Sequence, residues 1–211
     1  QYVIERLGAL SGPDSIYAAG VGQHQMWAAQ FVGYERPGTW LNSGGLGTMG
    51  FAVPAAMGAK VGRPDTTVWA VDGDGCFQMT NQELATCSIN DIPIKVALIN
   101  NSSLGMVRQW QESFYGERYS ASDMLNGMPD FIALARSFGV DGMKITSRDQ
   151  LHGELQQALS SPAPMLIDVH VRRGENCYPM VPPGKSNAQM VGLPAHPELA
   201  MDTTRNCPAC G

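Results

Sequence analysis

The feature that most constrains the fold is the regular alternation of short apolar runs with stretches of helical periodicity. Six runs are nearly continuous in apolar residues, which is typical of strands buried on both faces. They span residues 15–21, 39–42, 66–71, 94–99, 143–146 and 165–171. Helices are expected between them at 25–33, 49–61, 82–90, 130–138 and 148–160. This order predicts an α/β fold, a doubly wound six-stranded parallel sheet with helices on both faces.

The length of 211 residues suits one domain and a tail. We expect a domain over 1–180 and an extended, proline-rich tail over 181–211. The tail ends in Cys207-Pro208-Ala209-Cys210, which offers two of the four ligands that a structural zinc ion needs. A truncated zinc ribbon and an unliganded tail both remain open. Because the chain begins with Gln1, we expect it to be cut from a longer polypeptide.

Charge and hydropathy exclude two classes of partner. The formal net charge is -5 and no basic patch stands out, which argues against nucleic acid. No apolar run approaches the roughly 20 residues of a membrane-spanning helix, so no membrane partner is expected. The expected location is the cytoplasm, or a plastid if the source is plant-like.

Polar residues follow two successive strands of the predicted sheet. Gly73-Asp74-Gly75 comes just after the strand 66–71, and Asn100-Asn101 ends the next one. Parallel neighbours deliver such side chains to one sheet edge, where ligands bind in folds of this kind. Hard oxygen ligands suit Mg²⁺, and the glycines let the backbone approach a phosphate. Either motif alone is a common turn or loop opening.

A helix is expected soon after the Gly-Asp-Gly turn. Thr80-Asn81-Gln82-Glu83 predicts a capping box, with Thr80 as the N-cap residue and Glu83 folding back toward it. The whole order of turn, capped helix, strand and Asn-Asn resembles the fingerprint of thiamine-diphosphate enzymes. That resemblance implies Mg²⁺ ligation by the side chains of Asp74 and Asn101 and by the backbone carbonyl of Ser103.

Three further segments narrow the resemblance. Residues 21–27, 43–50 and 104–111 follow the first, second and fourth strands, and we expect all three on loops at the carboxyl-terminal sheet edge. Together they resemble the catalytic subunit of the acetohydroxyacid (acetolactate) synthase family, with a likeness that covers roughly 15–192. The resemblance implies a substrate pocket at Met106 and Trp110. It implies cofactor contacts from Val21, Gly22, Gln23, His24, Gly47, Met49, Gly73, Asp74, Gly75, Cys76, Asn101, Ser103, Leu104, Gly105 and Met106.

Several of these residues have a plainer interpretation. Met49 would serve equally as the start of a buried helix face, although a polarizable side chain here can also support a heteroaromatic ring. Met106 and Trp110 are four residues apart, which is the spacing of a core stripe on a helix. His24 would suit a solvated helix start. Cys76 is expected to pack without a nucleophilic role.

The resemblance implies decarboxylation of pyruvate and carboligation to a second 2-ketoacid, pyruvate or 2-ketobutyrate, in branched-chain amino-acid biosynthesis. Thiamine diphosphate and Mg²⁺ bind here, while FAD and the activating Glu belong to domains outside this chain. No catalytic residue is therefore assigned within it, and the isolated chain is expected to be inactive. The full-length subunit is expected to form a homodimer or tetramer and to bind a regulatory small subunit.

Two other functions remain open. The chain resembles, less closely, other thiamine-diphosphate-dependent decarboxylases or carboligases such as pyruvate oxidase and glyoxylate carboligase. Met106 and Trp110 within the Gly-Met-Val-Arg-Gln-Trp-Gln run argue against them. The chain would also suit a cofactor-binding module without activity of its own.

Overall fold

The computed structural model describes residues 1–192. The chain divides into two compact units, Gln1–Asn176 and a second one that begins at Cys177. No helix among the described residues is long and apolar enough to cross a lipid bilayer.

The first unit is built on one sheet of six parallel strands. The strands are β1 (Ile16–Ala19), β2 (Trp40–Asn42), β3 (Val68–Gly73), β4 (Lys95–Asn100), β5 (Asp141–Ile145) and β6 (Met165–His170). Their order across the sheet is β2-β1-β3-β4-β6-β5, and every neighbouring pair is parallel. The predicted doubly wound parallel sheet is confirmed.

Burial follows the position of each strand in the sheet. All six residues of β3 and all six of β4 are buried, as central strands covered on both faces require. The edge strands β2 and β5 are less buried. Complete burial therefore marks the two strands, β3 and β4, that are followed by the predicted metal ligands.

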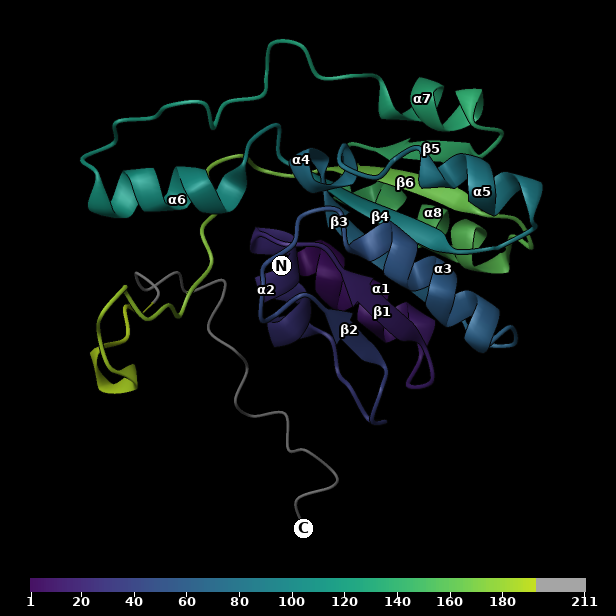
Figure 1. Cartoon of the computed structure of the whole chain (residues 1–211), viewed down its shortest axis with the longest axis horizontal. Coiled ribbons are helices and arrows are strands. Elements are labelled where there is room, and N and C mark those ends of the chain that lie inside the picture. The colour runs from purple at the N-terminus through teal and green to yellow at the C-terminus, as the bar shows by residue number, and fades with distance from the viewer. Residues whose placement is uncertain (193–211) are drawn as a thin grey trace. The chain divides into compact units, whose positions relative to one another are not determined.

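Helices cover both faces of the sheet (Figure 1). They are α1 (Tyr2–Ser11), α2 (Gln23–Phe31), α3 (Ala52–Gly62), α4 (Asp74–Phe77), α5 (Glu83–Ile89), α6 (Gly105–Phe114), α7 (Phe131–Ser137) and α8 (Arg148–Ser160). One apolar core joins α3, α4, α5 and α7 to the strands. On the other face α1 packs against α2 and α8, and both α2 and α8 contact the sheet.

Two sequence expectations about helices are wrong. The segments 21–27 and 104–111 do not lie wholly on loops, because α2 begins at Gln23 and α6 begins at Gly105. The capping box at Thr80 does not form: α5 begins at Glu83, and Gln82 at its N-cap makes no side-chain bond. The Thr80 hydroxyl instead donates to the carbonyl of Gly50 at 2.9 Å, which ties the turn after α4 to the loop before α3.

The second unit has short-range structure up to residue 192. Met180 and Val191 form an antiparallel bridge, and a 3-10 turn, η1, spans Asn187–Gln189. Cys207 and Cys210 of the predicted zinc half-site lie outside the described residues.

Candidate functional site

A cavity opens where the winding of the sheet reverses. The chain leaves β1 toward β2 on one side and later returns to β3 on the other, so the loops after β1 and β3 diverge. Such a switch point is where open α/β sheets bind ligands. The cavity has a volume of about 740 Å³ and is lined by residues that follow β1, β3 and β4.

The predicted site residues gather at this cavity, with one exception. All predicted cofactor and substrate contacts line it except Gly47. Gly47 sits at φ 64° in a turn closed by its own N–H, which donates to Ser43. Met49 lies three residues before α3 and lines the cavity, so the alternative that it starts the helix face is wrong.

The two side-chain oxygens predicted to bind Mg²⁺, from Asp74 and Asn101, accept hydrogen bonds from the same backbone amide. The Ser103 N–H donates to Asp74 Oδ2 at 3.2 Å and to Asn101 Oδ1 at 3.1 Å. Asp74 Oδ1 accepts a second bond, from the Gly75 N–H at 2.9 Å. Burial raises the pKa of Asp74 to about 6, so the buried carboxylate lacks a compensating positive charge. These hard oxygens from the ends of β3 and β4 fit a magnesium ion.

Gln23 fixes the orientation of the Asn101 amide. Its Oε1 accepts from Asn101 Nδ2 at 3.1 Å, which leaves Asn101 Oδ1 facing Ser103. Gln23 Nε2 in turn donates to Gln109 Oε1 at 3.0 Å and to the Glu175 carbonyl at 2.8 Å. A Cβ at Gly105 would lie 2.1 Å from Gln23 Oε1, so glycine is required for this close approach. The helix starts of α2 and α6 thus position a predicted metal ligand.

A buried carboxylate on β6 supports the turn that carries Asn101 and Ser103. Asp168 Oδ1 accepts from Asn100 Nδ2 at 2.9 Å, and Asn100 Oδ1 accepts from the Ser102 N–H at 3.1 Å. Ser102 adopts a left-handed conformation with φ 53°, which a non-glycine residue holds only when its surroundings impose it. Asp168 could not be predicted as a site residue, because nothing in its local sequence distinguishes it from any other polar residue in a strand.

We predict that Asp168→Ala lowers the free energy of unfolding by about 1 to 3 kcal/mol, since the buried Asn100 amide loses its acceptor. Asp141→Ala on the adjacent strand is the matched control, because the Asp141 side chain is 74% exposed where it pairs with Arg136. The control should cost at most about 1 kcal/mol. Urea unfolding followed by circular dichroism measures both values. Equal losses in the two variants would contradict the prediction.

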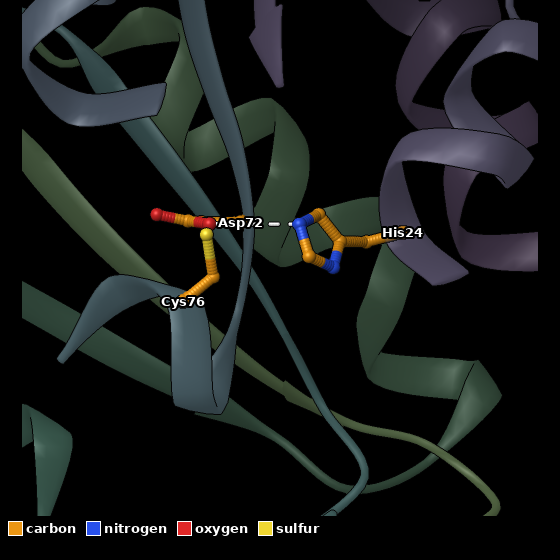
Figure 2. Close-up of side chains that lie close together, drawn as sticks. All are labelled: His24, Asp72 and Cys76. Carbon is orange, nitrogen blue, oxygen red and sulfur yellow. Dashed lines mark ion pairs between the residues drawn. The ribbon is translucent and has the colours of Figure 1, made fainter. Parts of the chain in front are cut away.

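Three polar side chains form a buried cluster (Figure 2), and two of them, His24 and Cys76, line the cavity. His24 Nε2 lies 3.5 Å from Asp72 Oδ1, and the Cys76 thiol is hydrogen-bonded to the same carboxyl group. Burial lowers the pKa of His24 to about 3 and raises that of Asp72 to about 7. The imidazole is therefore neutral, and His24 does not lie in a solvated helix start.

Cys76 has no features of a nucleophile. Burial and the neighbouring Asp72 carboxyl raise its pKa to about 12. Its sulfur accepts from the N–H groups of Gly50 at 3.0 Å and Val21 at 3.4 Å. These contacts join the loops that follow β1 and β2 to the start of α4, in keeping with the packing role expected from the sequence.

Helix α6 lines the cavity and has an unusual burial pattern. It buries the polar residues Arg108 and Gln109 and leaves Val107, Trp110 and Phe114 exposed. Trp110 is 41% exposed and lines the cavity, so the alternative of a core stripe is wrong. Cavity residues that were not predicted as site residues are Gln25, Met26, Trp27, Ile99, Val107, Gln111, Tyr115 and Arg118. Tyr115 and Arg118 could have been predicted from the sequence, because aromatic and basic residues follow directly after the segment 104–111.

Comparison with known proteins gives a consistent result. Residues 20–169 match the family model described as thiamine pyrophosphate enzyme, C-terminal TPP binding domain. The acetolactate synthase large subunit of Parasynechococcus marenigrum is 67% identical over 94% of this chain. The acetolactate synthase of Mycobacterium bovis is 56% identical, and the acetolactate synthase large subunit of Corynebacterium glutamicum 55%, each over 90% of the chain.

The alignments cover 32%, 31% and 31% of those three relatives, so the chain spans about a third of their length. The matched region begins at the end of β1 and ends within β6, and it contains the loops that form the cavity. The fold, the switch-point cavity and these similarities agree, and the chain belongs to the thiamine pyrophosphate enzymes as a C-terminal TPP-binding domain of the acetolactate synthase type.

Proposed function

We propose that this chain is the cofactor-binding part of an enzyme that decarboxylates pyruvate and joins the remaining two-carbon unit to a second 2-ketoacid. With pyruvate as acceptor the product is acetolactate, and with 2-ketobutyrate it is acetohydroxybutyrate, both precursors of branched-chain amino acids. The observation that carries the proposal is the convergence of Asp74 Oδ2 and Asn101 Oδ1 on the Ser103 amide at the cavity.

The chain's residues divide between metal and cofactor. Asp74 and Asn101 would hold Mg²⁺ through their side chains, and Ser103 through its carbonyl, and diphosphate oxygens and water would be its other ligands. Met49 would support the thiazolium ring through a polarizable contact. When bound, thiamine diphosphate supplies the electron sink for decarboxylation. The protein supplies position: Gln23, Asn100 and Asp168 hold the ligand turn in one geometry before any ligand arrives.

Substrate selection is assigned to α6. Met106 and Trp110 lie on the cavity side of this helix, where an indole offers a flat apolar wall for the acceptor's alkyl group. One additional methylene against such a wall is worth about 1 to 3 kcal/mol in transition-state binding. Trp110 would therefore favour 2-ketobutyrate over pyruvate as acceptor.

The remaining parts of the proposed enzyme lie outside this chain. We propose that the activating Glu and the FAD site belong to other domains of the full-length subunit. That subunit would form a homodimer or tetramer in the cytoplasm or a plastid, and would bind a regulatory small subunit. The proposal is tested on the full-length protein. It should form acetolactate from pyruvate only when thiamine diphosphate and Mg²⁺ are both present, and production without either would contradict it.

In the full-length protein, Trp110→Leu is expected to lower the ratio of acetohydroxybutyrate to acetolactate by about tenfold, within the range expected for one methylene. The ratio is measured by competition between equal concentrations of 2-ketobutyrate and pyruvate. Tyr119→Leu is the matched control: Tyr119 is 49% exposed in the segment after the same helix and does not line the cavity. An unchanged ratio in Trp110→Leu, or an equal fall in Tyr119→Leu, would show that Trp110 does not select the acceptor.

A further inference from the structure

The buried cluster of His24, Asp72 and Cys76 has the composition of a transition-metal site. Each side chain offers one ligand atom, and the three atoms lie within 4.8 Å of one another. They come from the start of α2, the end of β3 and the first turn of α4, and Figure 2 shows His24 and the Cys76 thiol both facing the Asp72 carboxyl group. None of the three is among the residues predicted to bind Mg²⁺.

Two polar atoms of these side chains lack the partners that buried polar groups normally have, although Asp72 Oδ1, the oxygen nearest His24, accepts from the Gly73 N–H at 3.1 Å. His24 is 6% exposed and Asp72 is fully buried. Within residues 1–192, His24 Nε2 and Asp72 Oδ2 have no hydrogen-bond partner. Leaving such groups unpaired carries a substantial desolvation cost, so the cluster is set up to gain from a ligand that satisfies both.

The backbone is shaped around this cluster. A Cβ at Gly20 would lie 2.0 Å from Asp72 Oδ1 and 2.5 Å from Cys76 Sγ, so any larger residue there would displace both. The N–H groups of Gly50 and Val21 already point at the sulfur, as donors to a metal-bound thiolate do. The backbone after β1, at Gly20 and Val21, and before α3, at Gly50, therefore holds the ligand atoms in place.

The chemistry of the ligands selects the class of ion. Nitrogen and sulfur ligands suit borderline cations such as Zn²⁺, whereas Mg²⁺ prefers oxygen and keeps several waters. A thiolate and a carboxylate together cancel the charge of a divalent cation, which a buried position favours. On binding, the thiol proton of Cys76 would pass to solvent.

We propose that His24, Asp72 and Cys76 form a binding site for a borderline divalent cation such as Zn²⁺, separate from the oxygen-ligand Mg²⁺ site. His24 and Cys76 line the cavity, which gives the ion a route of entry and a source of water for the fourth position.

The test uses the full chain without an affinity tag, carrying Cys207→Ser and Cys210→Ser so that the tail cysteines do not bind metal. Zn²⁺ affinity is measured by competition with a chromophoric chelator in millimolar Mg²⁺. One Zn²⁺ per chain is expected. Cys76→Ser should weaken binding by at least about a hundredfold, because loss of even an outer partner of a metal ligand costs about 10- to 100-fold. Cys87→Ser, a buried core cysteine on α5, is the control and should bind as tightly as its parent.

A second measurement does not depend on any variant of the cluster. Co²⁺ bound to the same parent chain should show a thiolate-to-cobalt charge-transfer absorption that Zn²⁺ abolishes. Three results would overturn the proposal: no Zn²⁺ retained, Zn²⁺ displaced by Mg²⁺, or cobalt bound without the thiolate band. Zn²⁺ affinity unchanged in a folded Cys76→Ser variant would do so as well, since it would place the ion elsewhere.

Discussion

Replacing Asp74 with asparagine is expected to weaken Mg²⁺ and thiamine diphosphate binding together, by about a hundredfold to a thousandfold. The carboxylate is the only anionic side chain of the three predicted ligands, and one charge at contact distance is worth about 4 kcal/mol at an intermediate effective dielectric. Because the metal would bridge the protein and the diphosphate, one lost ligand affects both affinities. Calorimetric titration of the full-length protein with thiamine diphosphate, with and without Mg²⁺, measures the effect.

The variant should remain folded because two changes oppose each other. Removing a buried charge whose pKa is raised to about 6 is favourable. Losing an acceptor that faces a backbone N–H costs about 1 to 3 kcal/mol. Asp123→Asn changes the net charge equally on the segment that bridges to Ser103, and it should leave both affinities intact. Unchanged affinity in Asp74→Asn would mean that Asp74 is only a turn residue.

The chain of residues 1–211 by itself is expected to fold, to bind Mg²⁺ and the diphosphate end of the cofactor weakly, and to make no measurable acetolactate. Folding is expected because the six-stranded sheet and its helices are complete within the first unit. Weak binding follows because the pyrimidine half of the cofactor would face water instead of an enclosing surface. Without the activating Glu, the loss of acid-base help alone amounts to about 10² to 10⁴ in rate.

The decisive experiment incubates the pure chain with pyruvate, Mg²⁺ and thiamine diphosphate, and then adds the remaining domains of the subunit as a separate polypeptide. Acetolactate that appears only after mixing would support the prediction, and product from the chain alone would refute it. A parallel mixture containing the Asp74→Asn chain shows whether the activity depends on this cofactor site. Circular dichroism of the chain before mixing verifies that it is folded.

The sheet was predictable because its central strands are mostly apolar. Strands β3 and β4 are buried along their whole length, so their sequences carry little ambiguity. The same pattern marks β6, of which only His170 is exposed. Since alternating strands and helices imply that the strands are parallel, the carboxyl-terminal edge was also predictable as the location of the site.

Helix α6 was missed because its burial pattern is inverted. Periodicity analysis assumes that the buried face is apolar, but this helix buries Arg108 and Gln109. Those side chains form hydrogen bonds with groups distant in sequence: Arg108 bonds Asn176 in addition to Glu112 on the same helix, and Gln109 bonds Gln23. A local pattern carries no information about such partners.

The candidate site likewise contains some residues that were predictable from the sequence and others that were not. Asp74 and Asn101 were identified because they sit in short motifs at strand ends, where position along the chain fixes position in space. Their supports, Gln23 and Asp168, depend on hydrogen bonds across 78 and 68 residues of sequence. Thr80 was predicted wrongly for the same reason. Its local sequence fits a capping box, but its hydroxyl donates to the distant carbonyl of Gly50.

The winding order of the sheet has a consequence for folding kinetics. The predicted ligands of the metal come from β3 and β4, while Gln23 follows β1, so the site exists only after three strands have paired. A chain in which β1 has not yet docked has the sequence motifs but no place for the diphosphate. Ligands that bind only the completed fold slow its unfolding and leave the earlier steps unaffected. Added cofactor should therefore lengthen the lifetime of the native state without hastening its formation.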